Sequence, residues 1–212
     1  MKVLVVYYSL TGQAGIASSL TADAARETGA EVTMCRIDFA DPAIRPQRPF
    51  SFGDVKRWSD AAEKGELFPI SYEPRNALAQ RYDLIIVFSN TWQHHPSCPI
   101  RSLLAAPEFK SVLRGTPFAV YVVSRRLWEK NAGIVKQEGE AAGGRCIAVH
   151  HFHHHGGSIT SLFTTVTYMM RSGDSVPWPL PKFGLSNADV ARVKPATREV
   201  LAKAQTTVAS VA

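Results

Sequence analysis

The chain has 212 residues, of which 45% are hydrophobic and 20% are charged. This length suits one domain, and these proportions exclude a disordered or collagen-like chain. The net charge of +6 comes from scattered lysines and arginines, with Lys56-Arg57 and Arg125-Arg126 the only adjacent pairs. Dispersed positive charge suits the attraction of small anions but forms no concentrated patch, so we expect no nucleic-acid partner.

The three cysteines, Cys35, Cys98 and Cys146, lie far apart in the sequence and form no CxxC pair. This spacing argues against a disulfide framework and against a structural zinc ribbon, and it favours a reducing compartment. The apolar run at 3–6 is too short to span a membrane and has no signal-peptide cleavage pattern. We expect a cytoplasmic protein that does not contact a membrane.

Five apolar runs rich in valine and isoleucine recur at wide spacing, at 3–8, 32–37, 84–88, 118–123 and 146–149. Such runs, without strict polar alternation, are typical of strands buried on both faces of a parallel sheet. The sequence therefore predicts five parallel strands.

Helices are predicted between these strands, at 15–28, 100–113 and 131–142. Gly29, Gly115 and Gly143 follow them, as expected at helix C-termini, and Pro107 predicts a break inside the second helix. The alternation of strands and helices predicts an α/β fold with right-handed crossovers: a doubly wound, five-stranded parallel sheet with helices on both faces. We expect a single domain over 1–212.

Two segments depart from this alternation. Between the second and third strands lies an insertion at 39–79, in which five prolines and five aromatic residues interleave over 41–74. A connection of this length is usually functional or disordered, and its aromatic residues favour a packed flap. After the last strand we expect a helix at 159–171, then a C-terminal extension at 173–212 with a helix at 186–208 that Ser186 caps.

A candidate anion site follows the first strand directly, in the loop Ser9-Leu10-Thr11-Gly12-Gln13-Ala14. In a parallel sheet this loop leads into a helix N-terminus, where backbone N–H groups and the helix dipole attract phosphate. Ser9 and Thr11 add hydroxyl groups and Gly12 permits close backbone approach, without the lysine of a nucleotide P-loop. The alternative is that the two hydroxyls only cap the helix.

The loops after the third and fourth strands, 89–96 and 124–131, would form the rim of the same site. Asn90 and Thr91 offer hydrogen bonds to a ligand, and Trp92 either stacks on a ring or packs in the core. Arg125, beside Arg126, either meets an anionic group or forms a surface pair with Glu129.

The histidine-rich stretch 150–155 is expected to follow the fifth strand at the same edge. Its imidazoles could line a substrate, transfer protons, chelate a metal ion or simply end a strand. Because no carboxylate or cysteine accompanies them at a metal-ligand spacing, we assign no metal ion and no catalytic residue.

The loop at 9–14 resembles the FMN-phosphate loop of the flavodoxin family, whose pattern is a hydroxyl residue, any residue, Thr, Gly, any residue and then commonly Thr. Ala14 departs from the last position, so one donor is lost. The resemblance implies a flavodoxin-like fold that binds FMN. Its phosphate would contact Ser9, Thr11, Gly12, Gln13 and Ala14, and its ring Asn90, Thr91, Trp92, Ser124 and Arg125.

Over most of its length the chain also resembles the dialkylresorcinol condensing enzyme-like subgroup, at 7–13, 113–117, 126–128 and 183–186 among other segments. Nothing in it resembles the catalytic cysteine of a ketosynthase, however. This second resemblance implies a flavin-dependent oxidoreductase that aromatises a cyclic diketone.

We therefore expect an FMN-dependent oxidoreductase that acts on a small molecule such as a quinone, a cyclic diketone or a phenol. NAD(P)H is one candidate for the hydride donor, and a homodimer is one candidate for the oligomeric state. One alternative is a flavodoxin-type electron carrier that docks to a redox partner. Another is a flavin-free binding module, in which the substitution at Ala14 reflects a decayed site.

Overall fold

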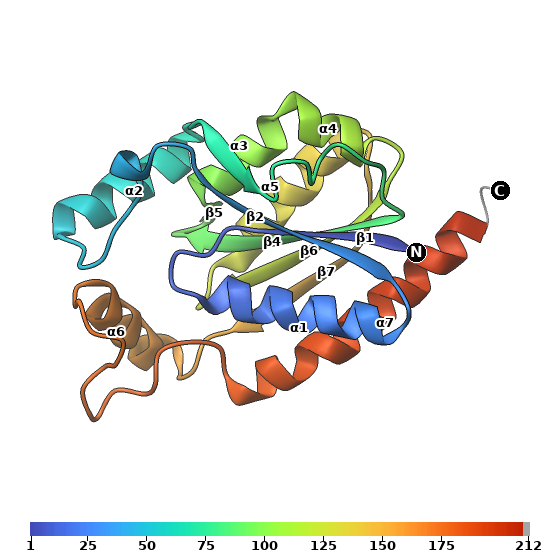
Figure 1. Cartoon of the computed structure of the whole chain (residues 1–212). Coiled ribbons are helices and arrows are strands. Elements are labelled where there is room, and N and C mark those ends of the chain that lie inside the picture. The colour runs from blue at the N-terminus through green and yellow to red at the C-terminus, as the bar shows by residue number, and fades with distance from the viewer. Residues whose placement is uncertain (210–212) are drawn as a thin grey trace.

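A parallel sheet forms the centre of the computed structural model, which describes residues 1–209 except for the side chains of Ser158 and 207–209 (Figure 1). Its strands run side by side in the order β2-β1-β4-β6-β7, and each pairs with its neighbours in parallel. These strands are β1 (Lys2–Tyr7), β2 (Glu31–Phe39), β4 (Leu84–Trp92), β6 (Pro117–Ser124) and β7 (Arg145–His153).

This order is that of the flavodoxin-like doubly wound sheet, so the predicted fold class is confirmed. The structure adds two short antiparallel strands to the predicted five. β3 (Ile70–Glu73) pairs with β2 at one edge of the sheet, and β5 (His95–Pro96) pairs with the end of β4.

Alternate residues of the central strands face two separate cores. In β1, Leu4 and Val6 pack into one core, and Val3 and Val5 pack into the other. All eight residues of β6 are buried. Because both faces are covered, apolar residues follow one another without polar alternation, which is the pattern that identified the strands.

Helices cover the two faces of the sheet. α1 (Gln13–Glu27) and α7 (Asn187–Ala209) lie together on one face. The other face carries α3 (Cys98–Ala105), α4 (Pro107–Leu113) and α5 (Trp128–Ala141). The predicted break at Pro107 is confirmed, since α3 and α4 meet there.

The insertion at 39–79 contains a helix that the sequence analysis missed, α2 (Phe52–Lys64). It begins with a capping box, in which Ser51 Oγ accepts from the Asp54 N–H at 3.1 Å and the Asp54 carboxylate accepts from the Ser51 N–H at 2.8 Å. Trp58 on this helix is buried against Phe39 and Phe68. The capping pattern was the available signal, and the surrounding prolines obscured it.

β4 and β7 run well past their predicted ends at 88 and 149, which corrects the interpretation of the segments that follow. Ser89–Trp92 belong to β4 rather than to a loop, and His150–His153 belong to β7. β4 extends because β5 folds back on it, pairing Thr91 with Pro96 and Trp92 with His95. Both strand ends are rich in polar side chains, so hydropathy alone ended both strands too early.

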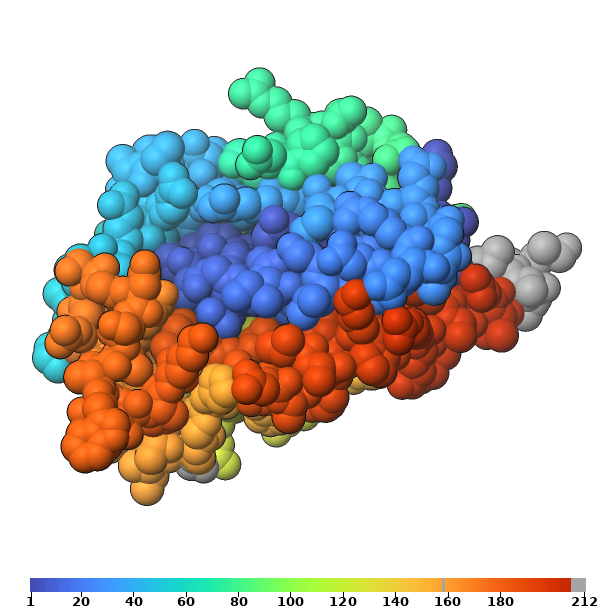
Figure 2. Space-filling model, turned by 60° about the horizontal axis from the view of Figure 1, so that its bottom comes forward, coloured from blue at the N-terminus to red at the C-terminus, as the bar shows by residue number. Residues whose placement is uncertain are grey.

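The helix α6 (Ser158–Met169) and the helix α2 stand at the carboxyl end of the sheet (Figure 1). In Figure 2 the orange residues of α6 and of the loop after it meet the light-blue residues of the insertion. Among residues 1–209, no helix has the length and apolar character needed to cross a membrane.

Replacing Gly139 by alanine tests the packing of α5 on the sheet. A Cβ atom at Gly139 would lie 2.5 Å from Phe118 Cζ, whereas one at Gly133 on the same helix would meet nothing within 4 Å. We expect Gly139→Ala to lower the free energy of unfolding by about 1–3 kcal/mol through overpacking. Gly133→Ala is the matched control and should raise it by about 0.5–1 kcal/mol through helix propensity. Equal effects in urea unfolding would contradict this packing.

Candidate functional site

The loop after β1 ends at a helix N-terminus with unused backbone donors. Gly12 occupies the N-cap of α1 with a φ of 83°, and the first helical hydrogen bond runs from the Ile16 N–H to the Gly12 carbonyl. The N–H groups of Gln13 and Ala14 therefore lie outside the helical ladder. Because the N-cap residue has no side chain, these donors remain available to an anion.

The three polar side chains of this loop differ in their roles. Ser9 Oγ accepts a hydrogen bond from the Gly15 N–H at 3.1 Å, so Ser9 does support the start of the helix. Gln13 Oε1 accepts from the Leu185 N–H at 2.8 Å, which leaves Gln13 its backbone N–H for a ligand. Thr11 lies on the wall of a cavity, with its side chain partly exposed.

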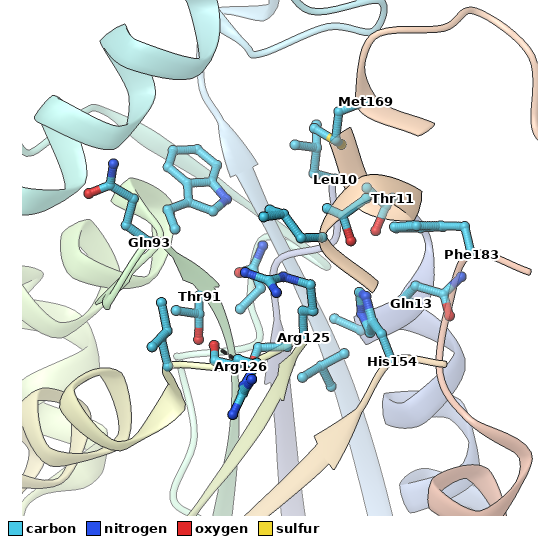
Figure 3. A pocket seen from close by; sticks show the side chains of 18 of the residues that line it. Leu10, Thr11, Gln13, Thr91, Gln93, Arg125, Arg126, His154, Met169 and Phe183 are labelled. Carbon is cyan, nitrogen blue, oxygen red and sulfur yellow. Dashed lines mark hydrogen bonds between the residues drawn. The ribbon is translucent and has the colours of Figure 1, made fainter. Parts of the chain in front are cut away.

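That cavity has a volume of about 580 Å³ and lies at the carboxyl edge of the sheet. This volume falls within the range of roughly 300–1,000 Å³ found for small-molecule sites. Figure 3 shows Thr11, Gln13, Arg125, His154 and Phe183 around it. All of the predicted contact residues except Gly12 line it: Ser9, Thr11, Gln13, Ala14, Asn90, Thr91, Trp92, Ser124 and Arg125.

Hydrogen bonds from neighbouring elements hold the polar end of β4 in place. Asn90 Oδ1 accepts from the Ser97 hydroxyl at 2.8 Å, and Thr91 Oγ1 accepts from Asn131 Nδ2 at 2.9 Å. Asn131 is fully buried at the start of α5 and also accepts from the Ser89 hydroxyl at 2.7 Å. Asn131 was not predicted, and it positions Thr91 without lining the cavity itself.

Trp92 packs in the core, one of the two roles that the sequence left open, and its position also exposes it to the cavity. It lines the cavity, and it also packs edge-to-face on Tyr8 and on Trp58, with ring centroids 6.2 and 5.5 Å apart. These contacts with Tyr8 and Trp58 fix the orientation in which the Trp92 indole ring lines the cavity.

The individual residues that roof the cavity were not predicted, although the insertion at 39–79 was predicted to form a packed flap. The roof is formed by Val55 and Ser59 of α2, by Leu162, Thr165 and Met169 of α6, and by Phe183. These residues come from segments far apart in the sequence, and their pattern contains no motif. Only the folding of the insertion and of α6 over the sheet edge brings them together.

Arg48 ties the insertion to α6 above the cavity. Its guanidinium lies 3.5 Å from the centroid of the Tyr168 ring and donates to the carbonyls of Tyr168 and Arg171, each at 2.9 Å. Tyr168 in turn stacks on Phe183 with ring centroids 3.7 Å apart. A cation at the C-terminus of a helix also complements the helix dipole, so Arg48 holds α6 by charge as well as by hydrogen bonds.

The histidines of β7 separate into different environments because side chains alternate along a strand. His151 is buried, shares a hydrogen bond of 2.9 Å with the hydroxyl of Ser124, and stacks on Trp128. Burial, assisted by the neighbouring His153, lowers the pKa of His151 to about 4. His153 is half exposed and faces Asp189, with 3.7 Å between Nδ1 and Oδ1.

His154 is the histidine of this stretch that lines the cavity. Burial, together with His151 and the charge of Arg125, lowers the pKa of His154 to about 4. Its Nδ1 atom is buried and has no hydrogen-bond partner among the described residues. Within the described part of the chain, no three His, Cys, Asp or Glu side chains gather in a way that would hold a metal ion.

The neutral state of His151 makes stability depend on pH. Its pKa is 6.5 in the unfolded chain and about 4 in the fold, so its contribution is complete above pH 6.5 and is lost as the pH falls toward 4. We expect His151→Gln to reduce the wild-type loss of unfolding free energy between pH 7 and pH 5 by about 2 kcal/mol. The control His94→Gln, at an exposed position on the rim, should lose as much unfolding free energy between pH 7 and pH 5 as the wild type loses. If His151→Gln also loses as much as the wild type, the hypothesis is wrong.

Replacing Arg48 tests the tie between the insertion and α6. Arg48→Met removes the donors to the carbonyls at the end of the helix, so we expect faster amide hydrogen exchange across 158–169 with little change in α1. Arg75→Met, an exposed change in the same insertion, is the control. Unchanged protection of α6 in the Arg48 variant would show that the contact does not hold the helix.

Of the comparisons with known proteins, the one with solved structures identifies the fold. No protein-family model matches the chain, and a search of curated proteins gives no match. Among solved structures, a flavodoxin from the domain Archaea has a TM-score of 0.54 and 11% identity, covering 97% of this chain and 99% of that one. A Streptococcus pneumonia TIGR4 flavodoxin has a TM-score of 0.51 and 12% identity, covering 96% and 99%.

The flavodiiron protein from Giardia intestinalis has a TM-score of 0.53 and 11% identity, and the match covers 97% of this chain but 37% of that one. Identities this low show a shared fold, while function has to be argued from the site. The protein therefore has the flavodoxin-like fold, with α2 and α6 at the carboxyl edge of its sheet.

Proposed function

We propose that the protein is a flavoprotein that binds FMN at the carboxyl edge of its sheet and acts as an oxidoreductase on a small molecule. One observation carries this proposal: the cavity joins an uncapped helix N-terminus to a roofed, largely apolar space. The first feature suits a phosphate group and the second suits a planar ring. The solved flavodoxins that share the fold support the choice of FMN among phosphate-bearing ligands.

The residues of the phosphate loop fit this cofactor. The N–H groups of Gln13 and Ala14, the hydroxyl of Thr11 and the close approach that Gly12 permits would hold the phosphate by neutral donors. Ala14 supplies its backbone N–H and no hydroxyl, which leaves one side-chain donor fewer than the flavodoxin pattern has.

The opposite wall would hold the ring. Asn90, Thr91 and Trp92 lie at the end of β4, where the hydrogen bonds of Ser97 and Asn131 and the packing of Tyr8 preorganise them. FMN, when bound, supplies the hydride chemistry. The protein orients the ring, excludes water with the α2 and α6 roof, and sets the polarity through Ser124 and Arg125.

The roof favours an enzyme over an electron carrier, because two helices cover the edge at which a carrier would meet its partner. The substrate would occupy the space between the ring and the side chains of Val55, Leu162 and Met169. A quinone, a cyclic diketone or a phenol fits these apolar walls, and NAD(P)H is the hydride donor to test first. We place the activity in the cytoplasm, where the free thiols Cys35, Cys98 and Cys146 stay reduced.

Retention of FMN by the purified protein, followed by absorbance after desalting, tests this function. We expect the wild type to retain flavin near one equivalent per chain, and Thr11→Val to weaken FMN binding about ten-fold by removing a hydrogen bond to a charged group. Riboflavin lacks the phosphate, so its affinity should be the same in both proteins. If the wild type retains no flavin, the proposed function is wrong.

Turnover separates the enzyme from the carrier. The enzyme should oxidise NAD(P)H continuously with a quinone as acceptor. A loaded protein that transfers electrons to a redox partner and shows no such turnover would instead be a carrier.

A further inference from the structure

The cavity contains positive charge that the phosphate loop does not use. Arg125 and Arg126 both line it, and among the residues that the structure describes no Asp or Glu side chain does. Two adjacent guanidinium groups repel each other, so an anion close to both lowers the electrostatic energy of the site. Glu129 lines a neighbouring hollow, which both arginines also line.

This charge starts at some distance from the site proposed for the cofactor phosphate. The phosphate loop follows β1, whereas Arg125 and Arg126 follow β6, and β4 lies between these strands in the sheet. Neighbouring strands are about 4.8 Å apart, so the two loops begin about 10 Å from each other. The cavity therefore has one end built from neutral donors and a second one that is cationic.

A buried polar atom lies on the same wall. His154 is partnered by Phe183 through an edge-to-face contact of 5.2 Å, but its Nδ1 has no hydrogen-bond partner among the described residues. Buried ring nitrogens are usually hydrogen-bonded in folded proteins. Ring nitrogens of His95, His150 and His151 are also buried and unpaired among the described residues, but of these histidines only His154 lines the cavity, where a ligand group can approach it. Arg125 and His154 both line this cavity, and both also line the neighbouring hollow.

We infer that the substrate is a flat, apolar molecule that carries a carboxylate, for which Arg125 is the specificity-determining residue and His154 an additional hydrogen-bonding group. A guanidinium matches the two oxygens of a carboxylate with parallel N–H donors. The apolar body would lie between the flavin ring and the α6 residues Leu162 and Met169. This inference rests on the proposed function, because it divides the cavity between cofactor and substrate.

Calorimetric titration of the FMN-saturated protein with naphthoate and naphthamide tests the inference, because these probes share a ring system and differ in charge. We expect naphthoate to bind at least ten-fold more tightly, with an affinity that falls as salt is added. Arg125→Gln should reduce the naphthoate affinity about ten-fold and leave the naphthamide affinity unchanged. His154→Phe should also weaken naphthoate, and Arg75→Gln, an exposed charge removal, should change neither probe.

The outcomes separate this inference from the proposed function. Equal binding of the two probes by the wild type would overturn the inference while FMN retention still supported the function. An Arg125→Gln variant that lost affinity for FMN but not for riboflavin would also overturn it, since the arginine would then hold the cofactor phosphate. If the protein retained no FMN, the same titration on the cofactor-free chain would still decide the charge preference.

Discussion

Parallel hydrogen bonding of the five main strands is the constraint on which the site depends. It forces β1, β4, β6 and β7 to end at one edge, so the loops that follow them meet although they lie far apart in the chain. The phosphate loop, the polar end of β4, the two arginines and His154 all reach the cavity for this reason. The strands themselves are held by apolar packing on both faces, which leaves their carboxyl ends free for polar side chains.

The roof gives this sheet edge its particular chemistry. α2 and α6 add apolar side chains above loops that are polar. Arg48 joins the insertion at 39–79 to α6 by its contacts with Tyr168. The chain shares its fold with solved flavodoxins over nearly its full length although few of its residues are identical to theirs. Many apolar combinations satisfy the same core, while the site residues are free to change with function.

The histidine-rich stretch shows how backbone geometry assigns roles that composition leaves open. Because β7 continues to His153, alternate imidazoles face opposite sides: His150 meets Tyr121, and His151 meets Ser124 and Trp128. His154 follows the strand and turns to the cavity, where the bridge to Leu185 holds its backbone. Burial keeps His151 and His154 neutral near pH 7, so the cationic end of the cavity is set by the arginines.

The α/β fold class, the glycines that end the helices and the loop at 9–14 could be predicted from the sequence, because they depend on local periodicity and on residues adjacent in the chain. The sequence could not give the extent of β4, whose last residues become a strand only when His95 and Pro96 pair with them. Nor could it give Asn131 behind Thr91, or the contact of Arg48 with Tyr168, which is 120 residues away. The tertiary structure decided these features, because each is a contact between distant segments whose free energy exists only once both are in place.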